Sequence, residues 1–100
     1  MTADGGGWKP DWVVAPALVL AEWLEEYGMS VTVVAATAVG RRHRDFAAAK
    51  IQAVLDREPL TEECADILAR GTRVPARFWL GLEHNYRAGL AAGLIDTEAP

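Results

Sequence analysis

The strongest structural signal in this chain is the stretch Val74-Pro75-Ala76-Arg77-Phe78-Trp79-Leu80-Gly81-Leu82-Glu83-His84-Asn85-Tyr86. Proline is tolerated in the first turn of a helix, because its missing N–H would have no intrahelical partner there and its fixed φ suits the turn. We therefore expect a long helix that begins at Pro75 and ends near Ala92. Large apolar side chains recur along it at spacings of three and four: Trp79, Leu82, Tyr86 and Leu90. One side of this helix thus carries most of its apolar bulk.

Two interpretations of this apolar side stay open. The four side chains either face the core of the domain or form a dimer or partner interface, since a small domain can leave part of a long helix exposed. Trp8 and Trp12 present a similar choice, because they precede the first expected helix. They either fold back on the domain as a hydrophobic clasp or contact a partner.

Two helices are predicted in the first part of the chain. The first begins near Pro16 and ends at Tyr27, because Gly28 stands at the left-handed stop position. Ser30 can cap a second helix. The β-branched residues 31–34 could equally begin a buried strand, so this segment is predicted as helix with strand as the alternative.

Two more helices are predicted before Pro75. Asp45 can cap a third, and Thr61 can cap a short fourth that ends at Gly71. The third would turn four apolar side chains toward the core: Ala47, Ile51, Val54 and Leu55. Together these signals predict an all-α domain of five helices.

The predicted domain covers residues 15–92, between a flexible N-terminal tail of residues 1–14 and a short tail of residues 93–100. The 100 residues suit one small domain with one core. With 51% apolar and 24% charged residues, the chain is too apolar to be disordered. No uncharged run is long enough to cross a bilayer and no signal peptide pattern is present, so we expect a cytoplasmic protein without a membrane partner.

Catalytic residue types are scarce in this sequence. It has one serine, one cysteine and two histidines, and none of them lies in a nucleophile motif or at a metal-ligand spacing. The acidic pairs Glu25-Glu26 and Glu62-Glu63 are adjacent, so their members point about 100° apart on a helix rather than converging. We expect no enzyme, no metal and no cofactor.

Positive charge is concentrated in one place. The chain has a formal net charge of -4, yet Arg41-Arg42-His43-Arg44 forms a basic island. Such an island either neutralises an anionic partner or serves as a solvated loop.

Three separated pieces of the sequence carry a resemblance to a known family. They are residues 20–30, Pro59-Leu60-Thr61, and the stretch from Pro75 to Tyr86 with its proline, Phe-Trp-Leu and Asn-Tyr elements. As a set they resemble the HigA-like antitoxins of the XRE helix-turn-helix family, over roughly residues 12–90. The resemblance implies a lambda-repressor-like, five-helix helix-turn-helix domain of phage or bacterial type. It further implies a homodimer that binds operator DNA and pairs with a toxin.

The chain departs from this family where the family reads DNA. The segment from Ser30 to Ile51 is longer than its family counterpart, so an enlarged turn that includes the basic island is expected. The family usually has a glutamine after the capping serine, where it helps to hold a phosphate. Here Val31 stands in that place.

The resemblance implies DNA contact by the second and third helices. Base readout in the major groove uses arginine or lysine for guanine and asparagine or glutamine for adenine, whereas Ala48, Ala49 and Ala53 occupy much of the expected reading side. The candidate DNA-binding residues are Arg41, Arg42, Arg44, Lys50 and Gln52. The arginines would neutralise phosphates and supply affinity without sequence information.

Two functions follow from the sequence. The first is a small helix-turn-helix transcriptional regulator that resembles an antitoxin and binds double-stranded operator DNA as a dimer. The alternative is a helix-turn-helix-derived protein-interaction module from a phage or mobile element, without specific DNA binding. The alanines of the third helix, Val31 and the acidic balance favour the alternative.

Overall fold

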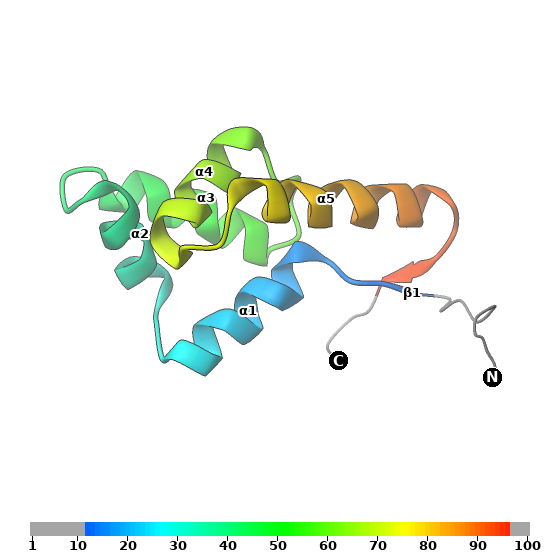
Figure 1. Cartoon of the computed structure of the whole chain (residues 1–100), viewed down its shortest axis with the longest axis horizontal. Coiled ribbons are helices and arrows are strands. Elements are labelled where there is room, and N and C mark those ends of the chain that lie inside the picture. Colours follow the sequence, from blue (N-terminus) through cyan, green and yellow to red (C-terminus); the bar gives the residue numbers. More distant parts are fainter. Residues whose placement is uncertain (1–11, 97–100) are drawn as a thin grey trace.

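The computed structural model describes residues 12–96, and it confirms the predicted all-α class. The helices are α1 (Pro16–Tyr27), α2 (Val31–Val39), α3 (Arg44–Leu55), α4 (Glu62–Thr72) and α5 (Ala76–Ala91). Two short strands, β1 (Trp12–Val13) and β2 (Ile95–Asp96), flank them in the sequence. Figure 1 shows α2, α3 and α4 gathered toward one end of the long axis, while the second half of α5 extends toward the other end, where the strands pair.

Local capping explains where three helices begin and end. Helix α1 has the predicted bounds, with Pro16 as its first residue and Gly28 in the left-handed conformation at φ 61°. Ser30 Oγ accepts a hydrogen bond from Val33 N at 3.2 Å, so residues 31–39 form a helix and the strand alternative is wrong. Thr61 Oγ1 accepts in the same way from Cys64 N at 3.2 Å. These oxygens satisfy amide donors that a helix leaves without partners in its first turn.

The connection between α2 and α3 corrects two predictions. Helix α3 begins at Arg44, so Asp45 lies in its first turn and does not cap it. The carbonyl oxygen of His43 accepts the bond from Ala47 N at 3.1 Å, and the charge of Asp45 is favourable near the positive helix end. Only residues 40–43 remain between the helices. The expected enlarged turn is therefore wrong, because four residues connect the two helices.

Gly71 has a different role from the predicted one. It does not end α4, which continues to Thr72 before Arg73 takes the left-handed conformation at φ 69°. A Cβ at Gly71 would lie 2.5 Å from Val34 Cγ1 and 2.7 Å from the Val34 carbonyl oxygen. Glycine is therefore required here because α2 and α4 approach each other closely.

The apolar side of α5 belongs to the core. Trp79 is fully buried in the main cluster, and Tyr86 is 3% exposed in a second cluster with Ala15 and Ala17. Leu82 packs on the first cluster and Leu90 on the second. Trp79 and Tyr86 are therefore not available as a dimer or partner interface, whereas Leu82 and Leu90 are only partly buried, and for them the interface stays a prediction. The main cluster joins residues from all five helices, including Leu20, Val34, Ile51, Leu68 and Trp79.

The described residues of the two predicted tails, 12–14 and 93–96, contribute to the structure. Strand β1 pairs in parallel with β2, with Trp12 opposite Ile95 and Val13 opposite Asp96. The Val13 side chain packs so closely on α5 that a Cβ at Gly89 would overlap it. The ordered unit thus extends beyond residues 15–92 at both ends. Trp12 is 45% exposed beside Ile95, and Trp8 lies outside the described residues.

Two glycines in helices provide a matched test of the α2–α4 contact. We expect Gly71→Ala to lower the free energy of unfolding by about 1–3 kcal/mol, because the added methyl group overpacks the contact with Val34. Gly81→Ala is the control: Gly81 lies in α5, and a methyl group added there would have no neighbouring atom within 4 Å. It should raise the free energy of unfolding by about 0.4–1 kcal/mol. Urea unfolding of both variants measures this, and equal effects of the two changes would contradict the close packing.

Candidate nucleic-acid interface

Arg41 and Arg42 lie in the short connection between α2 and α3. Both are exposed, and the chain enters the connection through Gly40 at φ 83°. Figure 1 shows this connection at the end of the molecule opposite to the paired strands. Within residues 12–96, neither arginine takes part in an ion pair. Two unpaired guanidinium groups therefore lie at one extremity of an acidic protein.

Arg44 is held more closely to the protein. Its side chain is 42% exposed and its Nε lies 3.6 Å from Asp45 Oδ1, while the Asp45 side chain is 98% exposed. The carboxylate offsets part of the positive charge of Arg44. Arg41 and Arg42 are thus the principal cations of the predicted island.

Lys50 and Gln52 do not share a face with each other. Residues two apart on a helix point about 160° away from each other. Lys50 turns toward α4, where its Nζ lies 3.3 Å from Glu63 Oε1. Gln52 lies on the opposite flank and donates from Nε2 to Asp56 Oδ1 at 3.2 Å. The five predicted residues therefore do not form a single surface.

Whether Lys50 can act together with Gln52 depends on where Lys50 points and not on the strength of its ion pair with Glu63. A pair as exposed as Lys50–Glu63 contributes only about 0.2–1 kcal/mol, whereas a good bidentate contact to a base edge gives about 1–3 kcal/mol of discrimination against the wrong base. A nucleic acid could therefore displace Glu63. Lys50 is separated from Gln52 because helix geometry places the two side chains on different flanks of α3.

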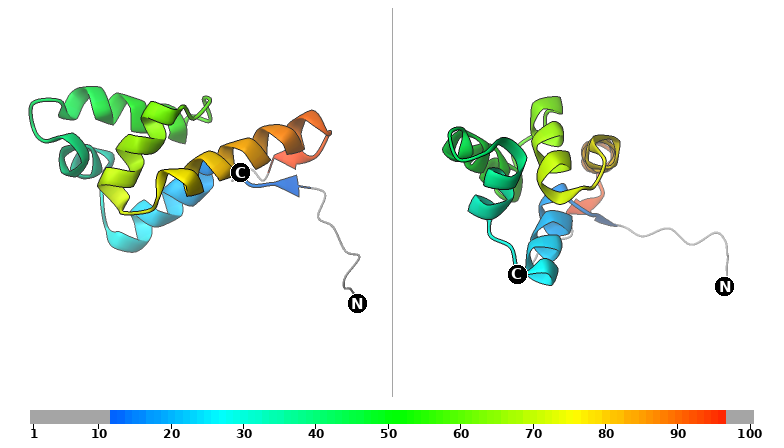
Figure 2. Two further views of the ribbon diagram at one scale, coloured as in Figure 1. Left: turned by 45° about the horizontal axis from the view of Figure 1, so that its top comes forward. Right: turned by 60° about the vertical axis from the view of Figure 1, so that its left-hand side comes forward.

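The outward side of α3 is uncovered in the described structure. Ala47, Ile51 and Val54 are buried on the inner side. In the left view of Figure 2, α3 lies along the margin of the molecule with no helix beyond it. The side chains on this outward side include Asp45, Phe46, Ala49 and Gln52. Phe46 and Ala49 are apolar, Gln52 is polar and Asp45 is charged, and the exposed Asp56 adds a second carboxylate beside Gln52.

Sequence reasoning missed a second group of cations, Arg70, Arg73 and Arg77. All three lie around the junction of α4 and α5, and none has an ion pair within the described part of the chain. The signal was present: residues 67–82 contain these three arginines and no acidic residue.

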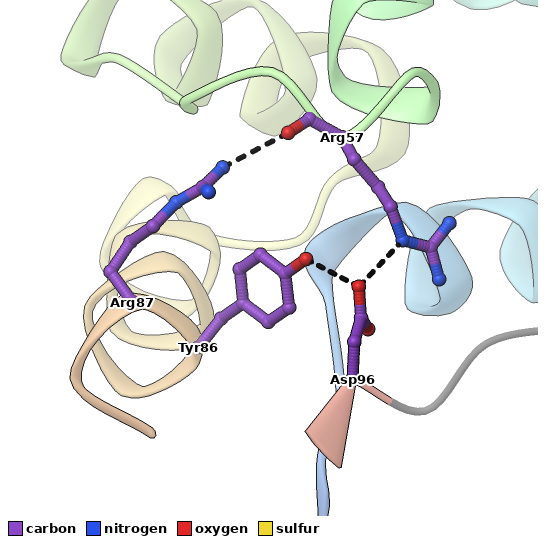
Figure 3. Close-up of polar contacts among 4 residues, drawn as sticks. All are labelled: Arg57, Tyr86, Arg87 and Asp96. Carbon is purple, nitrogen blue, oxygen red and sulfur yellow. Dashed lines mark hydrogen bonds and ion pairs between the residues drawn. The ribbon is translucent and has the colours of Figure 1, made fainter. Parts of the chain in front are cut away.

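The most extensive polar cluster lies at the other end of the molecule and is structural (Figure 3). Asp96 Oδ2 accepts hydrogen bonds from Tyr86 OH at 2.6 Å and from Arg57 Nε at 3.0 Å. Arg87 Nη2 donates to the Arg57 carbonyl oxygen at 3.1 Å. The cluster ties β2 to α5 and to the connection between α3 and α4.

Opposing effects set the pKa of both hydrogen-bonded groups. Burial favours the neutral form of Asp96, but hydrogen bonds from Tyr86 and Arg57 and the charges of Arg57 and Arg87 outweigh it, so the pKa lies below the usual 3.8. Burial, reinforced by the bond donated to Asp96, raises the pKa of Tyr86 above 10.0. At neutral pH the pair is therefore a neutral phenol donating to a carboxylate.

Comparisons with protein-family models, curated proteins and solved structures give no match. Within residues 12–96, no helix has the length and apolar character needed to span a membrane.

We expect Tyr86→Phe to lower the free energy of unfolding by about 1.5 kcal/mol, because it removes a hydrogen bond to a charged group. Tyr27→Phe is the matched control, since Tyr27 is 61% exposed, and it should change the free energy little. Urea unfolding at neutral pH measures both, and an equal loss in the two variants would contradict a specific role for the Tyr86 hydroxyl.

The same cluster predicts a pH dependence. Because the folded-state pKa of Asp96 is depressed, its stabilisation is present above the unfolded pKa and is lost as the pH falls through the folded value. The free-energy difference between the native protein and Asp96→Asn should therefore shrink when the pH is lowered from neutral to below 3.8. A difference that stays constant over this range would show that the Asp96 charge does not stabilise the fold.

Proposed function

We propose that this chain is a small helix-turn-helix DNA-binding protein similar to HigA-type antitoxins, and that it engages duplex DNA with the α2–α3 connection. The observation that carries the proposal is the pair of exposed, unpaired arginines in that connection, Arg41 and Arg42. A turn of about three to four residues, often with glycine, joins the helices of such a motif. Residues 40–43, beginning with Gly40, suit that description.

The proposed contact relies mainly on phosphates. Arginines at the start of α3 would neutralise the DNA backbone and position the outward side of α3 in the major groove. Lys50 and Gln52 border that side on opposite flanks, where Lys50 lies beside Glu63 and Gln52 beside Asp56. We therefore propose strong dependence on salt and fewer base contacts than the five predicted residues would make. A homodimer and a toxin partner remain proposals from the resemblance, without an assigned interface.

One observation favours the second candidate, a protein-interaction module. The outer side of α1 carries three glutamates, Glu22, Glu25 and Glu26. Beside them Tyr27 is 61% exposed, with its ring centroid 4.8 Å from that of Trp23. An exposed aromatic group within an acidic surface suits a basic protein partner better than DNA.

The salt dependence of binding tests the proposal. We expect the chain to bind the DNA that flanks its own gene, and Arg41→Ala/Arg42→Ala to reduce the slope of log K against log salt concentration by about 2, near one for each phosphate that is no longer neutralised. Fluorescence anisotropy over a range of salt concentrations measures the slope. Arg70→Ala/Arg77→Ala removes the same charge at the α4–α5 junction and should leave the slope nearly unchanged.

Two outcomes would contradict the proposal. If the native chain fails to bind this DNA at low salt, DNA is not its partner. If both double variants reduce the slope equally, net charge rather than the α2–α3 connection governs binding. A stoichiometric complex with a purified protein that Tyr27→Ala abolishes, with no DNA binding, would establish the second candidate instead.

A further inference from the structure

Phe46 is a large apolar residue that lies outside both core clusters. Its side chain is 53% exposed on the outward side of α3. Ala49 and Ala53 follow it at i+3 and i+7, so the three side chains form one apolar stripe along the helix. Lys50 Nζ lies 5.3 Å from the centroid of the Phe46 ring and borders the stripe on one flank. Gln52 borders it on the other flank.

The charges around this stripe indicate which partner covers it. Arg41 and Arg42 lie just before the helix and are free of ion pairs within residues 12–96. A polyanion is the partner that complements such cations. Duplex DNA also presents an apolar group in its major groove, the C5-methyl group of thymine, which alanine and phenylalanine side chains contact. Two acidic residues oppose a polyanion here: Asp45, which lies 3.6 Å from Arg44 Nε, and the exposed Asp56, whose Oδ1 accepts a hydrogen bond from Gln52.

We propose that α3 reads A·T base pairs, with Phe46 and Ala49 against thymine methyl groups and Gln52 hydrogen-bonded to adenine. This inference rests on the proposed DNA binding and adds the base preference of the same site. Gln52 must exchange its bond to Asp56 Oδ1 for adenine. That exposed bond joins residues one helical turn apart and is easily replaced. An amide side chain matches adenine, which offers an N7 acceptor and an N6 donor.

Removing the thymine methyl groups tests the inference directly. The DNA that flanks the gene is amplified once with thymidine triphosphate and once with deoxyuridine triphosphate. The two duplexes then differ only in the C5-methyl groups. We expect the full chain to bind the thymine duplex more tightly, by about fourfold for each methyl group buried. Phe46→Ala should abolish most of this difference and keep the salt dependence of binding.

Phe78→Ala is the matched control, because Phe78 is 46% exposed on α5. This variant should keep the preference for thymine. Circular dichroism of both variants shows whether each remains folded, and Phe46→Leu provides a second, milder change that should reduce the preference in part.

The outcomes separate this inference from the proposed function. Salt-dependent binding that is equal for the two duplexes would overturn the base preference and leave the DNA-binding proposal intact. If the Phe46→Ala variant keeps the full preference for the thymine duplex, the inferred base preference is also overturned, and the apolar stripe would be assigned to a protein partner. Failure of the native chain to bind either duplex would overturn both proposals.

Discussion

The close approach of α2 and α4 at Gly71 determines where the candidate binding surface lies. Because the Val34 backbone and side chain occupy the space in which a Cβ would stand, α2 lies directly against α4. The short α2–α3 connection then starts from an end of α2 that is fixed, and α3 must fold back so that Ile51 reaches the same core. A larger residue at position 71 would shift α2 and, with it, the arginines of the connection.

This packing divides α3 into two chemically different sides. The inner side supplies core residues, whereas the outer side presents a phenylalanine, small residues and a glutamine. Such a surface has few groups that hold phosphates, so affinity for DNA would come from the connection and selectivity from the helix. Within residues 12–96, the unpaired cations are Arg41 and Arg42 in the connection and Arg70, Arg73 and Arg77 around the α4–α5 junction, while acidic groups pair with Lys50 and Arg57.

The opposite end of the molecule has a structural role. Asp96 joins β2 to α5 through Tyr86 and to the α3–α4 connection through Arg57. Without these contacts the second half of α5 would have only α1 and β1 beside it. This polar network therefore holds β2 and the α3–α4 connection to α5.

The sequence by itself determined most helix boundaries, because capping and stop signals act within a few residues, but it misplaced the start of the third helix at Asp45 and the end of the fourth at Gly71. Ser30 and Thr61 begin helices through oxygen atoms that accept bonds three residues later, and Gly28 ends one through its left-handed backbone. The sequence analysis grouped Lys50 and Gln52 in one DNA-binding site, although residues two apart on a helix point about 160° away from each other. Only the tertiary structure decided which apolar residues are buried, because Phe46 and Trp79 are both large and aromatic and differ in what packs on them. Likewise, the pairing of β1 with β2 and the need for glycine at position 71 arise from segments distant in sequence, whose contacts no local pattern encodes.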